Sequence, residues 1–274
     1  MTRTITGLTD IIESYDTFIL DQWGVMHNGS NAFDFAVEAL EFLQAEDKKV
    51  VILSNSGKTR FASYERLEDS GISRDLYIDV LTSGDHMRHN FNKGKFNHLG
   101  TNALFFPWDN DYSVMQDLNI NNVETANADF ILCSGVDRGS VEAYLDDLEQ
   151  GIERGLELIV TNPDIVAMNP DGFLKTCPGA IAQAYEQMGG VVHWHGKPQV
   201  ELYDMCKNIV GGWDNAIAIG DSLEHDIAGA NVSGISSLFI ESGIHNKDLK
   251  TKTLQDLSKS FEAIPTYTTE WFAV

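Results

Sequence analysis

The chain has 274 residues, of which 43% are hydrophobic and 22% are charged, a composition typical of a folded globular protein and not of a disordered one. Its 41 Asp and Glu residues outnumber its 19 Lys and Arg residues, so the formal net charge is -22. We expect it to bind neither nucleic acid nor an anionic membrane, because both partners need clustered cations. An anionic substrate must then be attracted by a local positive group.

The first part of the chain alternates short apolar runs with helical patterns. Strands are predicted at residues 17–20 and 50–53, and helices at 33–45 and 60–69, the second of which ends at Gly71. Near the other end, residues 216–219 and 237–240 have the same strand character. Apolar strands in strand–loop–helix units predict an α/β fold with a Rossmann-like, doubly wound parallel sheet.

The middle of the chain, residues 84–190, reads as a separate α/β unit inserted into the first. Its predicted strands are residues 103–106, 130–133 and 158–160, and its predicted helices are residues 141–152 and 180–187. The core domain then comprises residues 1–83 and 191–274. In this division the strand-like residues 191–194 open the second core segment.

The cysteines and the apolar runs indicate the compartment. Cys133, Cys177 and Cys206 show no Cys-x-x-Cys spacing, which predicts buried thiols in a reducing environment. No apolar run approaches the roughly 20 residues of a membrane helix. Residues 1–12 lack the basic and then apolar pattern of a signal peptide. We therefore expect a cytoplasmic protein.

Polar side chains follow the predicted core strands, at the edge where ligands bind in open parallel sheets. They are Asp21 after the first strand, Ser54 and Asn55 after the second, Lys197 after residues 191–194, and Asp221 after residues 216–219, with Asp226 further on. Carboxylates can hold Mg²⁺ beside a phosphoryl group, whose remaining charge a lysine can neutralise. The pattern favours a magnesium and phosphate site.

Four segments resemble the ordered motifs of the haloacid dehalogenase superfamily: Ile19–Val25, Leu53–Asn55, Gly196–Pro198 and Gly220–Asp226. The large insertion between the second and third, which contains Thr161–Asp164, is similar to the cap of class IIA, the NagD-like branch. The resemblance implies an Mg²⁺-dependent phosphatase that acts on a small phosphorylated metabolite through an aspartyl-phosphate. Residues 84–190 would be an α/β cap domain, and caps of this kind often form homodimer contacts.

The resemblance also implies roles for the metal-binding positions. Asp21 would be the nucleophile and would bind Mg²⁺ together with Asp221 and the backbone carbonyl of Trp23. Asp226 would support the metal site by orienting its ligands.

Further roles concern the substrate. Ser54 and Asn55 would contact the transferring phosphoryl group, and Lys197 would neutralise it and keep Asp21 ionised. Asn162 and Asp164 would close over the substrate from the cap.

One position departs from the family pattern. Phosphatases of the superfamily carry a second aspartate two residues after the nucleophile, as general acid and base, and here that residue is Trp23. Its indole N–H only donates and cannot shuttle protons near neutral pH, and its ring either packs in the core or faces the cleft. His27 in the same loop, Asp164 from the cap, or a good leaving group would compensate, and we favour His27.

Trp23 also keeps two other functions open. One is a protein that binds a phosphorylated ligand with little turnover, and the other is a phosphotransferase whose acceptor is not water. Of the remaining histidines, His86, His89 and His98 are expected at the surface or at helix caps, and His193 and His195 in structural positions.

Overall fold

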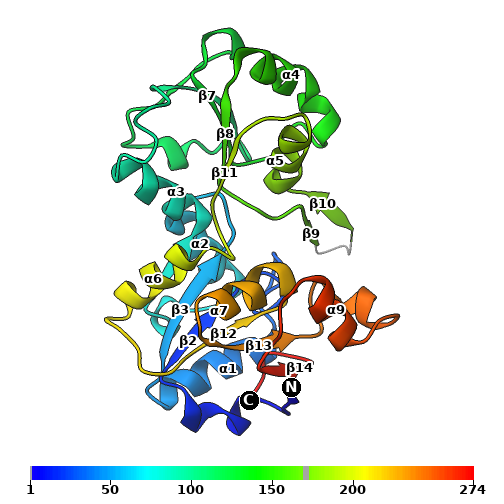
Figure 1. The fold of residues 1–274 in the computed structure, drawn as a ribbon. Coiled ribbons are helices and arrows are strands. Elements are labelled where there is room, and N and C mark those ends of the chain that lie inside the picture. Colours follow the sequence, from blue (N-terminus) through cyan, green and yellow to red (C-terminus); the bar gives the residue numbers. More distant parts are fainter. Residues whose placement is uncertain (1, 169–172) are drawn as a thin grey trace.

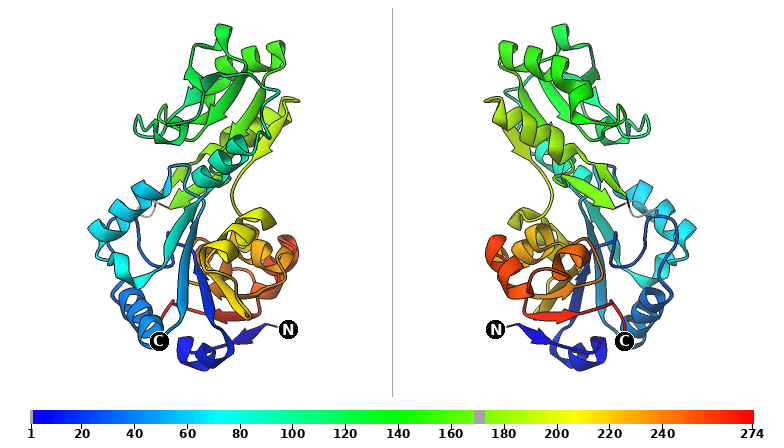
Figure 2. Two further views of the ribbon diagram at one scale, coloured as in Figure 1. Left: turned by 90° about the vertical axis from the view of Figure 1, so that its left-hand side faces the viewer. Right: turned by 90° about the vertical axis from the view of Figure 1, so that its right-hand side faces the viewer.

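The computed structural model describes residues 2–168 and 173–274, which form two lobes, each built on a parallel sheet (Figures 1 and 2). The larger sheet has seven strands in the order β1-β14-β13-β12-β2-β3-β4, and every neighbouring pair is parallel. Its strands are β1 Arg3–Thr4, β2 Thr17–Leu20, β3 Lys49–Ser54, β4 Asp79–Thr82, β12 Ala216–Gly220, β13 Ser236–Ile240 and β14 Tyr267–Thr269. The predicted Rossmann-like α/β core is confirmed.

Helices cover both faces of this sheet because its strands are apolar on both sides. Phe18 and Leu20 of β2 pack toward Leu40 of α1, whereas Ile19 packs on the opposite face with Leu202 of α6. The helices of this lobe are α1 Asp34–Ala45, α2 Arg60–Ser70, α6 Val200–Ile209, α7 Ala228–Val232, α8 Asn246–Leu249 and α9 Leu254–Ser260. Helix α2 ends at Gly71 as predicted, with the positive φ of 102° that glycine tolerates.

The second lobe holds a five-stranded parallel sheet in the order β11-β8-β7-β5-β6 (Figure 1). Helices α4 and α5 pack on one face, and α3 packs on the other. Its elements are α3 Ser83–Asn92, β5 Asn102–Phe106, β6 Asn121–Asn122, β7 Phe130–Cys133, α4 Leu145–Arg154, β8 Glu157–Val160, α5 Pro178–Gln187 and β11 Val192–Trp194. The predicted helix over residues 141–152 is instead a 3₁₀ turn, Val141–Tyr144, followed by α4.

The sheet pairing corrects one expectation about the division of the chain. Residues 191–194 were assigned to the core, but β11 pairs with β8, with His193 opposite Ile159, and so belongs to the inserted sheet. An apolar strand pattern does not specify which sheet a strand joins. The return to the core sheet is made only after Trp194.

Short elements connect the larger ones. An antiparallel pair, β9 Val166–Met168 and β10 Leu174–Thr176, extends from the inserted lobe. The 3₁₀ turns outside Val141–Tyr144 are Leu8–Asp10, Ile12–Ser14, Arg74–Leu76, Ser113–Met115 and Thr125–Asn127, and residues Leu223–Ile227 form a π-helical turn. The three cysteines are buried free thiols, as predicted. Within the described ranges, no helix is long and apolar enough to cross a bilayer.

The position of the site follows from the strand order. Strands β2 and β12 are neighbours, and the chain continues from β2 toward β3 and β4 on one side and from β12 toward β13 on the other. This is a topological switch point, where the loops after adjacent strands diverge and leave a crevice. Asp21 follows β2 and Asp221 follows β12, so both begin at this crevice.

Candidate active site

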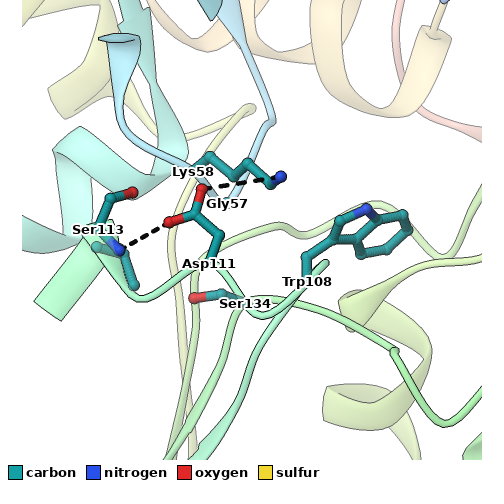
Figure 3. A pocket seen from close by; sticks show the side chains of 7 residues that line it. Gly57, Lys58, Trp108, Asp111, Ser113 and Ser134 are labelled. Carbon is teal, nitrogen blue, oxygen red and sulfur yellow. Dashed lines mark hydrogen bonds and ion pairs between the residues drawn. The ribbon is translucent and has the colours of Figure 1, made fainter. Parts of the chain in front are cut away.

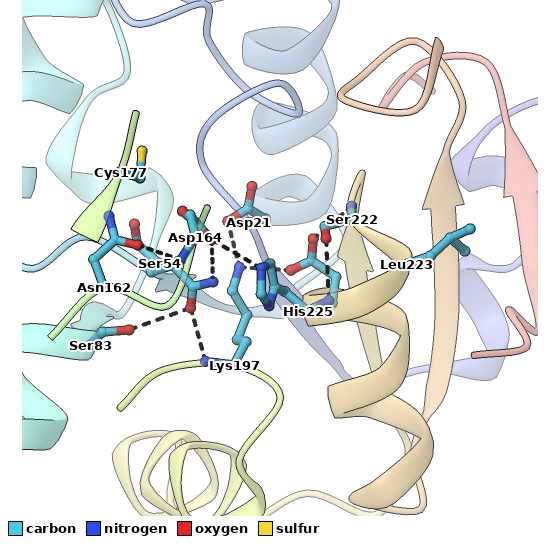
Figure 4. Close-up of polar contacts among 12 residues, drawn as sticks. Asp21, Ser54, Ser83, Asn162, Asp164, Cys177, Lys197, Ser222, Leu223 and His225 are labelled. Carbon is cyan, nitrogen blue, oxygen red and sulfur yellow. Dashed lines mark hydrogen bonds and ion pairs between the residues drawn. The ribbon is translucent and has the colours of Figure 1, made fainter. Parts of the chain in front are cut away.

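Lys197 lies at the centre of a buried cluster of charged side chains (Figure 4). Its Nζ donates to Asp21 Oδ1 at 2.6 Å, to Asp226 Oδ1 at 2.7 Å and to the carbonyl oxygen of Leu53 at 3.1 Å. Only 3% of the lysine side chain is exposed. Burial alone would lower the pKa of Lys197, but the carboxylates of Asp21 and Asp226 hold it well above its ordinary value. The lysine is therefore a fixed cation.

Asp221 completes the cluster from the end of β12. Its Oδ2 accepts a hydrogen bond from the backbone N–H of Ile244 at 2.8 Å. A Cβ on Gly24 would come within 2.2 Å of this oxygen and one on Gly243 within 2.0 Å, so the carboxylate fits only because both residues are glycine. Gly24 also has a φ of 82°, which favours glycine. The loop after Asp21 is thus shaped around the Asp221 carboxylate.

The cluster has the composition of a divalent cation site. Asp21, Asp221 and Asp226 each offer an oxygen, and these atoms lie within 4.8 Å of one another. Lys197 balances one of the three possible negative charges. The remaining negative charge would suit a cation that prefers oxygen ligands, such as Mg²⁺. Both oxygens of Asp226 already accept hydrogen bonds, one from Lys197 and the other from the N–H of Ser222 at 3.0 Å. Asp21 and Asp221 are thus the better placed ligands, and Asp226 positions the lysine.

Burial raises the pKa of Asp21 to about 7, against the opposing effect of Lys197. Burial, together with the charges of Asp21 and Asp226, also raises the pKa of Asp221 well above its ordinary value. In the unfolded chain both carboxyls ionise near pH 4. The stability that they contribute is therefore complete at low pH and is lost as the pH rises toward the raised pKa of the folded state.

We therefore expect the metal-free protein to melt several degrees lower at pH 8 than at pH 5.5, as measured by calorimetry in a chelator. Added Mg²⁺ should raise the melting temperature more at pH 8 than at pH 5.5, because it stabilises the ionised carboxylates. Asp221→Asn, which removes one of these carboxylates, should reduce both effects. An unchanged pH dependence in that variant would show that the destabilisation arises elsewhere.

Ser54 is the last residue of β3 and Asn55 follows it, and both residues line the same cleft as the charged cluster. Ser54 Oγ accepts a hydrogen bond from the N–H of Ser56 at 3.2 Å. Asn55 Oδ1 accepts from the N–H of Lys197 at 2.9 Å, and Asn55 Nδ2 donates to Asp164 Oδ1 at 2.7 Å. The amide of Asn55 thus fixes the loop that carries Lys197 and connects it to the inserted lobe.

His27 does not lie where the sequence analysis expected a general acid or base. Its side chain is fully buried, and its Nδ1 accepts a hydrogen bond from the N–H of Gly29 at 3.0 Å. Burial lowers its pKa to about 4, so the ring is neutral at physiological pH. Among the described residues, those that line the cleft do not include His27. The structure thus places His27 outside the cleft lining, since closeness in sequence to Asp21 does not by itself give access to the cleft.

Trp23 lines the cleft while its ring packs against the loop. The ring lies edge-on to His27, with centroids 5.6 Å apart. A Cβ on Gly29 would come within 2.2 Å of the indole, so Gly29 provides the space for it. The position of the usual second aspartate is thus filled by a packed aromatic ring.

Asp164 reaches the cleft from the segment between β8 and β9 (Figure 4). Besides Asn55, its carboxylate faces His225, with Asp164 Oδ1 and His225 Nε2 3.4 Å apart. Its backbone N–H donates to Asn162 Oδ1 at 2.8 Å, which orders the turn. His225 was part of a recognised motif but had no predicted role. Its partner lies 61 residues earlier in the chain, and no local pattern indicates such a pairing.

The cleft between the lobes has a volume of about 650 Å³ and also contains cations that the sequence analysis did not single out. Lys58, Arg66 and Lys175 line it, the first two from the core and the third from the inserted lobe. Lys58 Nζ lies 3.3 Å from Asp109 Oδ2 and 3.8 Å from Asp111 Oδ2, so it connects the lobes. Figure 3 shows the contact with Asp111. These side chains bring cations to the cleft of a protein whose net charge is otherwise strongly negative.

Comparison with known proteins places this geometry in context. A family model described as haloacid dehalogenase-like hydrolase matches residues 18–121, and a related model, HAD-hydrolase-like, matches residues 194–266. The chain is 23% identical to an acid sugar phosphatase of Staphylococcus epidermidis over 93% of its own length and 95% of the relative. It is 26% identical to the sugar-phosphatase AraL of Bacillus subtilis, over 92% and 97%.

A solved structure shows the same architecture. It is a hydrolase of the haloacid dehalogenase-like family from Brucella suis, with a TM-score of 0.86 and 26% identity, covering 98% of this chain and 100% of that one. The match spans both lobes, so the shared fold includes the inserted unit.

Proposed function

Because the chain belongs to the haloacid dehalogenase-like hydrolases, we propose that it hydrolyses the phosphate monoester of a small metabolite, with a sugar phosphate as the substrate class. The observation that carries the proposal is the buried cluster of Asp21, Asp221 and Asp226 around Lys197 at the switch point of the sheet. The relatives named sugar phosphatases support the substrate class. The inserted lobe would serve as a cap.

The reaction would proceed through a covalent intermediate on Asp21. A carboxylate oxygen attacks phosphorus, the bond from phosphorus to the ester oxygen breaks, and an acyl phosphate forms. Water then attacks this phosphorus, which releases inorganic phosphate and regenerates the carboxylate. Lys197 neutralises charge on the phosphoryl oxygens, and the Ser54 hydroxyl donates to one of them. Mg²⁺ held by Asp21, Asp221 and the carbonyl of Trp23 would supply further positive charge to the phosphoryl group.

We assign the proton transfer to Asp164. Its carboxyl lines the cleft and is held by Asn55, whereas Trp23 cannot shuttle protons and His27 is buried outside the cleft. Asp164 would protonate the leaving oxygen in the first step and accept a proton from water in the second. Because Asp164 comes from the cap, proton transfer would require the two lobes to be closed. The ion pair between Lys58 and Asp109 favours this closed arrangement.

Asp164→Asn tests this assignment in the first turnover. Rapid-quench measurement should show release of an alkyl leaving group slowed by about 10²- to 10⁴-fold, because an alkoxide needs a proton as it departs. Release of p-nitrophenolate, which departs unprotonated, should fall by about tenfold or less. Asp146→Asn, a change at an exposed aspartate of α4, is the matched control. Equal slowing with both leaving groups would remove Asp164 from the role.

Trp23 favours a second candidate, a protein that binds a phosphorylated ligand with little turnover. The same platform would hold the phosphate, and the missing second aspartate would keep hydrolysis slow. Calorimetry with inorganic phosphate and Mg²⁺, combined with a phosphate-release assay on sugar phosphates, separates the two. Tight binding without release of phosphate from any substrate would favour the binding protein. Release of the free sugar without inorganic phosphate, with a new phosphate ester formed on an added alcohol, would indicate a phosphotransferase.

A further inference from the structure

A second cluster of metal-ligand side chains lies in the inserted lobe, separate from the carboxylates of the cleft. It consists of His98, Glu157 and His193, whose nearest ligand atoms all lie within 4.8 Å of one another. Glu157 Oε2 is 2.5 Å from His193 Nε2 and 3.6 Å from His98 Nε2. We expected His98 at the surface or at a helix cap and His193 in a structural position, because the carboxylate that joins them is far from both in sequence.

Three different segments bring the side chains together. His98 lies in the turn between α3 and β5, Glu157 begins β8, and His193 is the middle residue of β11. Strands β8 and β11 are paired neighbours, so Glu157 and His193 are held by the sheet. The His193 ring also packs edge-on against buried Phe96, with centroids 5.2 Å apart. Two of the three ligands are therefore fixed before any ion binds.

From this arrangement we propose that His98, Glu157 and His193 form a binding site for Zn²⁺ or a similar transition metal ion. Two imidazoles and one carboxylate are a known ligand set for zinc with a fourth position left for water. Mg²⁺ takes oxygen ligands, so the site would differ in selectivity from the cleft. In a tetrahedral site with bonds of about 2.0–2.1 Å, ligand atoms lie roughly 3.3 Å apart. Small side-chain rotations from the distances above would reach that spacing.

Exposure and charge are compatible with metal entry. The exposed side-chain fractions are 57% for His98, 28% for Glu157 and 27% for His193, so an ion can reach the ligands from solvent. The net charge of -22 attracts cations to the surface. A bound ion would connect the segment that follows α3 to the strand that leads directly to Lys197. It would thus stabilise the region where the chain returns to the active site.

Zn²⁺ titration of the full chain by calorimetry tests the proposal. The Asp221→Asn background weakens metal binding in the cleft, so that the signal reports the second cluster. In that background, His98→Ala and Glu157→Gln should each weaken Zn²⁺ binding by at least about tenfold, whereas His89→Ala, a control at another partly exposed histidine, should not. Melting curves in a chelator establish that the variants are folded. Equal Zn²⁺ affinity in all of them would overturn the proposal.

Co²⁺ provides a second measurement that does not require substitution of the proposed ligands. In the same background, visible absorption bands of tetrahedral Co²⁺ bound to nitrogen and oxygen should appear and should disappear when Zn²⁺ displaces the ion. A spectrum of six-coordinate Co²⁺ in water would contradict the site. Neither measurement involves phosphate release. Absence of Zn²⁺ binding would therefore not contradict the proposed hydrolase activity, and absence of hydrolase activity would not contradict the metal site.

Discussion

Asp21→Asn is expected to reduce Mg²⁺-dependent phosphate release from p-nitrophenyl phosphate by on the order of 10³-fold or more, because an amide cannot form the acyl phosphate. The variant should melt no lower than the wild type at pH 8. Ionised Asp21 is buried at a cost, as its raised pKa of about 7 indicates, and asparagine removes that cost. Loss of turnover without loss of stability identifies a chemical role.

Asp16→Asn is the matched control for this experiment. Asp16 directly precedes the same strand, β2, and its carboxylate accepts hydrogen bonds from the backbone of Asp214 and Asn215. This substitution should lower stability and leave phosphate release largely unchanged. If Asp21→Asn retained most of the wild-type turnover, the covalent mechanism would be wrong.

Lys197→Met has the second largest expected effect, and it acts on stability as well as on activity. Without the lysine, Asp21 and Asp226 lose the cation that they share in the buried cluster. Removal of one partner from a buried ion pair typically costs about 3–5 kcal/mol. We expect a loss of that order in the free energy of unfolding, measured by urea titration in a chelator at pH 8. The loss should shrink at pH 5.5, where Asp21 is protonated.

The exposed Lys207 of α6 offers a control for the lysine substitution. Lys207→Met should change the free energy of unfolding by less than about 1 kcal/mol, as is usual at the surface. Mg²⁺ should restore part of the stability lost in Lys197→Met, because it supplies positive charge to the same carboxylates. A Lys197→Met protein as stable as the wild type in chelator would show that the lysine does not balance the cluster.

The sequence predicted the site where residues at strand ends are fixed by topology. Asp21 and Asp221 directly follow apolar strands and Ser54 ends one, and parallel pairing brings those ends to one edge whatever the side-chain details. The core strands and the helix that ends at Gly71 were likewise predicted by local patterns. Such features can be predicted because each depends on a pattern only a few residues long.

The rest of the site depends on contacts between distant segments. The pairing of β11 with the inserted sheet and the contact of Asp164 with His225 are set by tertiary packing, which periodicity does not report. The burial of His27 could not be predicted for the same reason, because it depends on how the loop folds back onto Trp23. The need for glycine at positions 24 and 243 is likewise set by tertiary structure, because it depends on the position of the Asp221 carboxylate.

Anomalous scattering from crystals grown with Mn²⁺ in place of Mg²⁺ can show whether Asp21 and Asp221 hold a divalent cation beside Lys197. We expect a peak in the cleft at coordination distance from both carboxylates, with the lysine still bonded to Asp21. A cleft without a peak at saturating Mn²⁺, or a peak that remains in place in Asp221→Asn, would contradict it.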